Sequence, residues 1–210
     1  MKRLASPFLI LCTAVLTACG CATTGADRAR GFNEYAARES AGADRILETL
    51  SIRPGQNIAD LGAGGGYFSY RFARATGEKG RVYAIDIDPE FLEFIRQESV
   101  RLNLDNIEVV EATSSDPGLR PECCDLIFLR DVYHHLEDRV QYFRNLRKYL
   151  KEGGRIAIID YRTEGLAGLI MMSHSTSPEQ IQQEMVQAGY RVLEEHEFLD
   201  HQSFLIFGAK

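Results

Sequence analysis

The 210-residue sequence predicts a single α/β domain, a doubly wound, Rossmann-like sheet with helices on both faces. Short apolar stretches alternate with amphipathic stretches, as strands do when crossover helices link them. A glycine cluster stands where the first strand passes into its helix. The length suits one domain, and 45% hydrophobic residues can form a core.

The first half of this domain contains clear start and stop signals. Pro89 can occupy the first position of a helix, with Asp88 before it as the candidate cap. Gly77 can close the preceding helix, in which Phe68 and Phe72 share one face. The predicted helices of this half are 44–50, 67–75 and 89–102, and the predicted strands are 57–61, 81–85 and 107–110.

The second half continues the alternation and ends in a strand pair. Ser177 and Gln180 have the spacing of a capping box, and Pro178 stands at the first helical position between them. The pair Gly153-Gly154 is expected to end the preceding helix. The predicted strands are 125–129, 155–159, 191–195 and 203–207, and the predicted helices are 137–150 and 177–187.

Composition excludes several classes of protein. The net charge of −6 argues against binding nucleic acid through bulk electrostatics, so no nucleic-acid partner is expected. No metal-ligand spacing occurs, so no metal site is predicted. Cys123 and Cys124 are adjacent, and neighbouring cysteines rarely bridge, because their Cα atoms are closer than a disulfide prefers.

The first residues have the pattern of a targeting segment. Two basic residues precede an apolar run that is too short to cross the roughly 30 Å of hydrocarbon in a bilayer. The run ends in LTAC, which resembles the bacterial lipobox, whose cysteine becomes the lipid-modified first residue of the mature protein. This resemblance implies a signal peptide over residues 1–18 and lipidation of Cys19. A plain secretory signal and a buried hydrophobic helix are the alternatives.

The lipobox interpretation also implies an organisation and a location. Small residues predict a flexible tether over 19–31, followed by the domain over 32–210. The protein is then expected to be a membrane-anchored lipoprotein that faces the periplasm, and a cytoplasmic protein is the alternative.

The glycine cluster has the pattern D-x-G-x-G-x-G, formed by Asp60, Gly62, Gly64 and Gly66. Glycine permits positive φ and lets a ligand approach the backbone without a Cβ in the way. Tyr67 occupies the place of the third glycine in G-x-G-x-x-G, the pattern that holds a pyrophosphate. This departure disfavours a nucleotide-dependent oxidoreductase.

Asp86 ends the second strand, 24 residues after Gly62. A carboxylate at this position can accept hydrogen bonds from both ribose hydroxyls of a nucleoside. Helix capping is the alternative role. The glycine loop and this acid together predict a two-point clamp for a nucleoside.

Residues 58–69 (IADLGAGGGYFS) and 82–92 (VYAIDIDPEFL) resemble motifs of the class I S-adenosylmethionine-dependent methyltransferases. The resemblance covers about residues 39–210 and implies a seven-stranded sheet of order 3-2-1-4-5-7-6 with strand 7 antiparallel. It implies S-adenosyl-L-methionine as the cofactor. This sulfonium has no phosphate, which explains the missing pyrophosphate pattern.

The resemblance also assigns cofactor-binding residues. It implies that Asp60, Gly62, Gly64 and Gly66 shape the methionine end of the site. It implies that Asp86 holds the ribose and that Ile87 lies against the adenine. Ala112 and Thr113 are matched to the adenine edge, although the family more often has Asp there.

In this family the segment after strand four borders the transferring methyl group. The candidates for orienting an acceptor are therefore Asp131, Tyr133, His134 and His135, of which Asp131 is also a candidate cofactor ligand. Histidine is a natural proton acceptor near neutral pH, and His135 matches the family's usual histidine. A purely structural histidine is the alternative.

Further polar candidates lie at the ends of later elements. Tyr161 and Arg162 follow the fifth strand, and His174 precedes the last helix. Arg162 could bind an anionic acceptor, or be an ordinary surface residue, and the apolar stretch 166–172 could cover the site.

The sequence thus predicts a lipid-anchored or exported methyltransferase that acts on a small-molecule acceptor. Its catalysis would rest mostly on positioning, because the sulfonium is already activated. A non-catalytic S-adenosylmethionine-binding lipoprotein is the alternative from another functional class.

Overall fold

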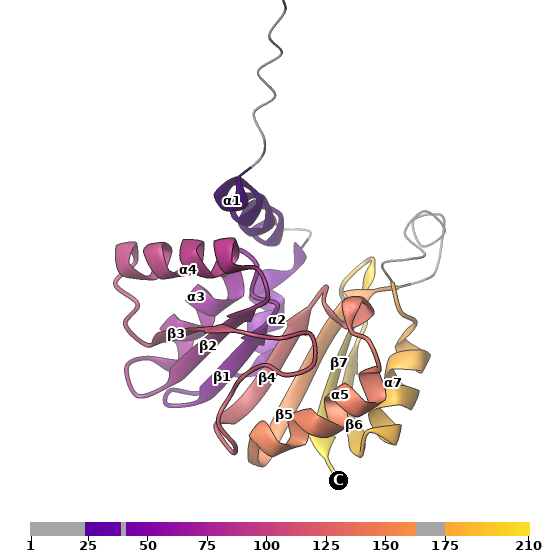
Figure 1. Cartoon of the computed structure of the whole chain (residues 1–210). Coiled ribbons are helices and arrows are strands. Elements are labelled where there is room, and N and C mark those ends of the chain that lie inside the picture. The colour runs from indigo at the N-terminus through magenta and orange to yellow at the C-terminus, as the bar shows by residue number, and fades with distance from the viewer. Residues whose placement is uncertain (1–23, 39–40, 163–174) are drawn as a thin grey trace, which may run out of the picture.

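The computed structural model describes residues 24–38, 41–162 and 175–210. The strands of this described part are β1 Asn57–Leu61, β2 Arg81–Asp86, β3 Ile107–Glu111, β4 Cys124–Arg130, β5 Leu150–Tyr161, β6 Tyr190–His196 and β7 Gln202–Ala209. They form one seven-stranded sheet of order β3-β2-β1-β4-β5-β7-β6 (Figure 1). β7 is antiparallel to both of its neighbours, β5 and β6. The predicted strand order and the antiparallel β7 are confirmed.

Helices cover both faces of this sheet. They are α1 Gly25–Ala36, α2 Ala43–Leu50, α3 Tyr67–Thr76, α4 Pro89–Arg101, α5 Arg139–Leu146 and α7 Pro178–Gln187, with one-turn 3-10 helices η2 Tyr133–His135 and η3 Arg147–Tyr149. None of the helices in the described ranges is long and apolar enough to cross a membrane.

The alternation of side chains along β4 shows how the two layers of core are divided. Leu126 and Phe128 point to the face covered by α2 and α3, where Phe72 packs edge-on against Phe128 with ring centroids 5.1 Å apart. Ile127 and Leu129 point to the opposite face, covered by α5 and α7. A strand buried on both sides reads as a continuous apolar run, which is why β4 was predictable.

The predicted tether is wrong from Thr24 onward, because Thr24 caps α1, which begins at Gly25. The Thr24 side chain accepts a hydrogen bond from the Asp27 backbone N–H, and the Asp27 carboxylate accepts one from the Thr24 N–H. This capping box starts the helix. Ala29 is completely buried against Phe91 and Phe94 of α4. The small residues that indicated flexibility instead permit close packing.

The predicted helix over 137–150 is also wrong at its end. The helix divides into α5 and η3, and β5 begins at Leu150, so Gly153 and Gly154 lie inside a strand. Cys124 pairs with Leu150 but Leu126 with Arg155, which marks a bulge in β5. Gly153, at φ 73°, accommodates this bulge in the left-handed region that glycine tolerates.

Several sequence predictions lie outside the described residues. They concern the signal peptide over 1–18, the lipidation of Cys19, the position of His174 and the apolar stretch 166–172.

Candidate active site

The glycine loop and the segment after β4 lie at one edge of the sheet. Leu61, the last residue of β1, pairs with Ile85 of β2 and Leu129 of β4, so the three strands end side by side. A Cβ added to Gly62 would lie only 2.2 Å from Cγ2 of Val132. The loop and the segment are therefore in direct contact, at the edge above which α1 lies in Figure 1.

Backbone conformation shapes the loop itself. Gly62, Gly64 and Gly66 have φ values of 75°, 53° and 81°, which favour glycine over any other residue. The N–H groups of Gly62 and Ala63 both donate to the Ile85 carbonyl, at 2.8 and 2.9 Å. These bonds hold the turn close to β2, where Asp86 follows.

Asp86 connects the loop to the start of α4. Its Oδ2 accepts a hydrogen bond from the Gly64 N–H at 2.9 Å, and its Oδ1 accepts one from the Asp88 N–H at 3.0 Å. The neighbouring Ile87 is 65% exposed, which is unusual for a large apolar side chain beside buried residues. An adenine ring against Ile87 and a ribose at Asp86 would fit this pair.

The other predicted adenine contacts lie beside Asp86. The Ala112 N–H donates to the Asp86 carbonyl at 2.9 Å, and Ala112 is half-buried. Thr113 is exposed, and its N–H donates to the Asp116 carbonyl at 3.0 Å. The residues predicted to contact the ribose and the adenine therefore lie close to one another.

Asp60 is buried beneath the loop. Its Oδ2 accepts a hydrogen bond from the Ser69 hydroxyl at 2.5 Å, and burial raises the pKa of the carboxyl to about 7. A cationic group nearby would restore its ionised form. The amino group of the methionine end of the cofactor is such a cation, so the residues fit S-adenosylmethionine.

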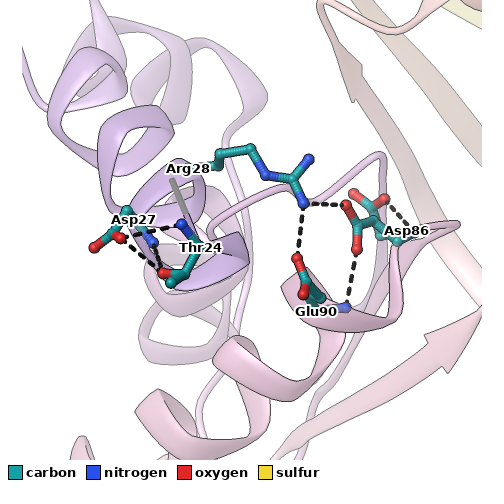
Figure 2. Close-up of polar contacts among 6 residues, drawn as sticks. Thr24, Asp27, Arg28, Asp86 and Glu90 are labelled. Carbon is teal, nitrogen blue, oxygen red and sulfur yellow. Dashed lines mark hydrogen bonds and ion pairs between the residues drawn. The ribbon is translucent and has the colours of Figure 1, made fainter. Parts of the chain in front are cut away.

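α1 covers this half of the site. The Asn33 side-chain amide donates to the Gly65 carbonyl at 2.8 Å, and a Cβ on Gly65 would lie 2.1 Å from the Ala29 carbonyl oxygen. Phe32 lies over Gly64 and remains 53% exposed. Figure 2 shows Arg28 reaching from α1 to the first turn of α4, beside Asp86.

On the other side of the edge, Asp131 is held in an unusual conformation. Its φ is 58°, and the Gln202 amide donates to its Oδ1. Arg130 in turn donates from Nη2 to Gln202 Oε1 at 2.8 Å, and its Nε lies 3.9 Å from Asp131 Oδ2. Burial, partly offset by Arg130, raises the pKa of Asp131 to about 6.

The two histidines after β4 differ in their surroundings. Nδ1 of His134 lies 2.7 Å from Oδ1 of Asp160, which is completely buried at the end of β5. His135 is exposed, and its ring centroid is 4.0 Å from that of His134. A carboxylate that orients a histidine is the arrangement of a general base. The geometry therefore favours His134 over His135.

The family model that describes a methyltransferase domain matches residues 52–202, more than half of the chain. The chain belongs to the class I S-adenosylmethionine-dependent methyltransferase family. The methyltransferase is 28% identical over 129 residues to the ubiquinone/menaquinone biosynthesis C-methyltransferase UbiE of Vibrio vulnificus strain YJ016. That match covers 58% of this chain and 49% of the relative, so the chain spans about half the length of the curated relatives it matches.

Solved structures show the same fold. A SAM-dependent methyltransferase from Aquifex aeolicus superposes with a TM-score of 0.72 at 24% identity, covering 78% of this chain and 87% of that one. An arsenic(III) S-adenosylmethionine methyltransferase from Chlamydomonas reinhardtii superposes with a TM-score of 0.58 at 20% identity, covering 74% and 63%. The cofactor that the resemblance implied is the cofactor of this family.

Tyr133 of the methyltransferase does not face an acceptor. It is completely buried, its hydroxyl donates to Glu184 Oε2 at 2.6 Å, and its ring stacks on Phe143 with centroids 5.3 Å apart. The prediction for Tyr133 is wrong, because η2 turns its side chain inward to hold α7 against the sheet.

Tyr161 and Arg162 have partners near the site. The Tyr161 hydroxyl lies 2.8 Å from that of Tyr35 in α1, and Arg162 Nε donates to the Gln202 carbonyl at 3.1 Å. Cys123 and Cys124 are buried free thiols with Sγ atoms 3.3 Å apart. Among the residues described, no cluster of three or more His, Cys, Asp or Glu could hold a metal.

Sequence reasoning missed Arg130, Asp160 and Gln202, and the covering role of α1. A signal existed for Asp160, because an acid that ends an apolar strand resembles Asp86. The spacing of Thr24 and Asp27 was likewise the signature of a helix start.

Proposed function

We propose that the enzyme transfers a methyl group to a small acceptor whose proton is removed by His134. The observation that carries this proposal is the pairing of His134 with the buried Asp160 at the same edge as the glycine loop. S-adenosylmethionine supplies an electrophilic methyl group, and the acceptor's nucleophilic atom bonds to its carbon as the sulfur keeps the electrons of the broken bond.

The chain's own residues position the acceptor and move its proton. His134, whose ring is oriented through Nδ1 by Asp160, is the group proposed to accept the proton. Asp131, whose pKa burial raises to about 6, is a second group that can accept and release a proton close to neutral pH. Retention of both groups favours an enzyme over a non-catalytic cofactor-binding protein.

The names of the relatives support a narrower acceptor class. They are C-methyltransferases of ubiquinone and menaquinone biosynthesis. We propose by extension that the acceptor is a small cyclic molecule with an acidic proton, and that it is methylated on carbon.

Two measurements test this function. Calorimetric titration with S-adenosylmethionine and with NAD should give binding of the first only. Incubation with methyl-labelled S-adenosylmethionine and a bacterial lipid extract should then label a small extractable product, which mass spectrometry identifies. Cofactor binding without any labelled product from lipid or aqueous extracts would favour the non-catalytic alternative.

We also propose that Cys19 is lipid-modified after cleavage of the Ala18–Cys19 bond, which would hold the protein at a membrane facing the periplasm. The lipobox-like LTAC supports this proposal. Replacement of Cys19→Ser should release the protein from membranes. Protein found free in the cytoplasm with residues 1–18 intact would contradict it.

A further inference from the structure

The start of α1 leaves little chain between the proposed anchor and the folded domain. Thr24 caps the helix, and Cys19 precedes it by five residues. Because an extended chain spans at most about 3.6 Å per residue, Thr24 lies within about 18 Å of the lipid-modified residue in any conformation of the connecting residues. A tether that continued to residue 31 would have allowed more than twice this reach.

α1 is attached to the cofactor edge by several independent contacts. Arg28 Nη2 donates to Asp88 Oδ2 at 3.0 Å and to Glu90 Oε2 at 2.9 Å, across to α4 (Figure 2). Ala29 is completely buried, and Asn33 donates to Gly65. The helix is therefore packed and hydrogen-bonded directly against the glycine loop and the start of α4.

These contacts limit how far the site can be from the membrane. Ala29 follows Thr24 by five residues, a rise of about 7.5 Å along the helix. Because Gly65 packs against Ala29, the glycine loop stays within roughly 30 Å of the anchor. The opposite edge of the sheet, where Glu152 and Arg155 lie, is separated from the glycine loop by the length of β1, about 17 Å, on the side away from α1 in Figure 1.

The surface of this edge suits a lipid boundary. Phe32 of α1, which lies over Gly64 in the glycine loop, is 53% exposed. Large apolar side chains of this kind favour the interface between headgroups and acyl chains.

We propose that the anchor holds the carboxyl edge of the sheet against the bilayer, so that the methyl acceptor is a molecule dissolved in the membrane. The proposal rests on the lipid anchor proposed above. An acceptor in the bilayer would reach His134 and Asp131 without crossing water, while the polar cofactor would enter from the aqueous side.

Paramagnetic lipids can test this orientation. The full acylated chain is placed in nanodiscs that contain a lipid with a paramagnetic headgroup, and amide signals are recorded by NMR. Amides of residues 64–66 and 86–88 should be broadened at least two-fold more than those of 152–155. Equal broadening at both edges, or stronger broadening at 152–155, would overturn the proposal.

A matched variant distinguishes the effect of the lipid anchor itself from the effect of the short linker on the orientation of the domain. A 20-residue Gly/Ser insertion between Cys21 and Ala22 keeps the anchor but adds an average reach of about 25 Å, so the contrast between the edges should collapse. An unchanged contrast would show that the orientation does not depend on the short linker. An unmodified Cys19 in the mass spectrum would overturn the anchor and this inference, whereas methyl transfer to an extracted acceptor would stand.

Discussion

The cofactor half and the acceptor half of the active edge are built in different ways. Around the glycine loop, backbone conformation and backbone hydrogen bonds fix the structure. The Asp86 carboxylate accepts hydrogen bonds from two backbone N–H groups. After β4, side chains from separate strands hold one another, as Gln202 of β7 holds Asp131. The first half is held mainly by backbone hydrogen bonds of the loop, with Asn33 of α1 added over Gly65, whereas the second half depends on side-chain contacts of the segment after β4 with β5 and β7.

Buried polar atoms show the same contrast. Four buried side-chain atoms of the described residues have no hydrogen-bond partner, and three of them are in the acceptor half: Arg130 Nε, Arg130 Nη1 and Asp160 Oδ2. Unpaired buried polar groups are costly, so native proteins keep them chiefly where function requires them. The comparison teaches that backbone hydrogen bonds fix most of the cofactor half, whereas the acceptor half concentrates buried charged side chains whose hydrogen bonding is incomplete among the described residues.

The largest expected effect is a loss of turnover when a residue of the acceptor half is replaced. Replacement of His134→Ala should lower turnover of the labelled product by about 10²–10⁴-fold, because the acceptor's proton would have no base. Asp160→Asn should act in the same direction through the orientation of His134. S-adenosylmethionine affinity should hardly change in either variant, which calorimetry measures.

His135→Ala is the matched control, since His135 is adjacent but exposed. It should retain most of the turnover. If His135→Ala loses as much turnover per folded molecule as His134→Ala, the assignment of the base to His134 is refuted.

These two halves were not equally predictable from the sequence. The cofactor half is local, because D-x-G-x-G-x-G and Asp86 can be recognised from short motifs. The contact between Gln202 and Asp131 depends on the register in which Tyr161 of β5 pairs with Gln202 of β7, and a single sequence does not reveal a register. Tyr133 was mistaken for a site residue because the turn of η2 could not be foreseen.

The next largest effect is a pH dependence of stability that comes from Asp60 in the cofactor half. Burial raises the pKa of Asp60 to about 7 in the folded protein, above its ordinary value of 3.8. Between these values the folded state binds one more proton than the unfolded state, so stability falls as pH rises from 4 to 7 and the cost persists above pH 7. The total contribution is about 4 kcal/mol.

Replacement of Asp60→Asn removes this titration. The free energy of unfolding of the variant, measured in denaturant at pH 4, 5.5 and 7, should fall less steeply than that of the wild type. Parallel pH profiles for the two proteins would contradict a buried, protonated Asp60.

A smaller effect concerns the ribose position of the cofactor half. Asp86→Ala should weaken S-adenosylmethionine binding by about 1.5–3 kcal/mol, the usual range for hydrogen bonds to a charged group. Asp88→Ala is the control, because Asp88 caps α4 by accepting from the Glu90 N–H at 2.9 Å. It should reduce stability by about 1 kcal/mol and leave affinity unchanged. Equal losses of affinity in the two variants would mean that both carboxylates stabilise the fold and that Asp86 does not bind the ribose.

The smallest effect tests the attachment of α1 to the cofactor half. Arg28→Ala removes both ion pairs to α4, which are exposed and therefore weak, so amide hydrogen exchange across α1 should accelerate by no more than about five-fold. Arg30→Ala is matched to it, because each of the two guanidinium groups lies over a phenylalanine ring of α4, but the ion pair of Arg30 is to Asp27 inside α1. Exchange near Gly65 should also rise in Arg28→Ala but not in Arg30→Ala, since Asn33 links that loop to the helix. Identical exchange in the two variants would mean that the packing of Ala29, rather than the ion pairs, keeps α1 in place.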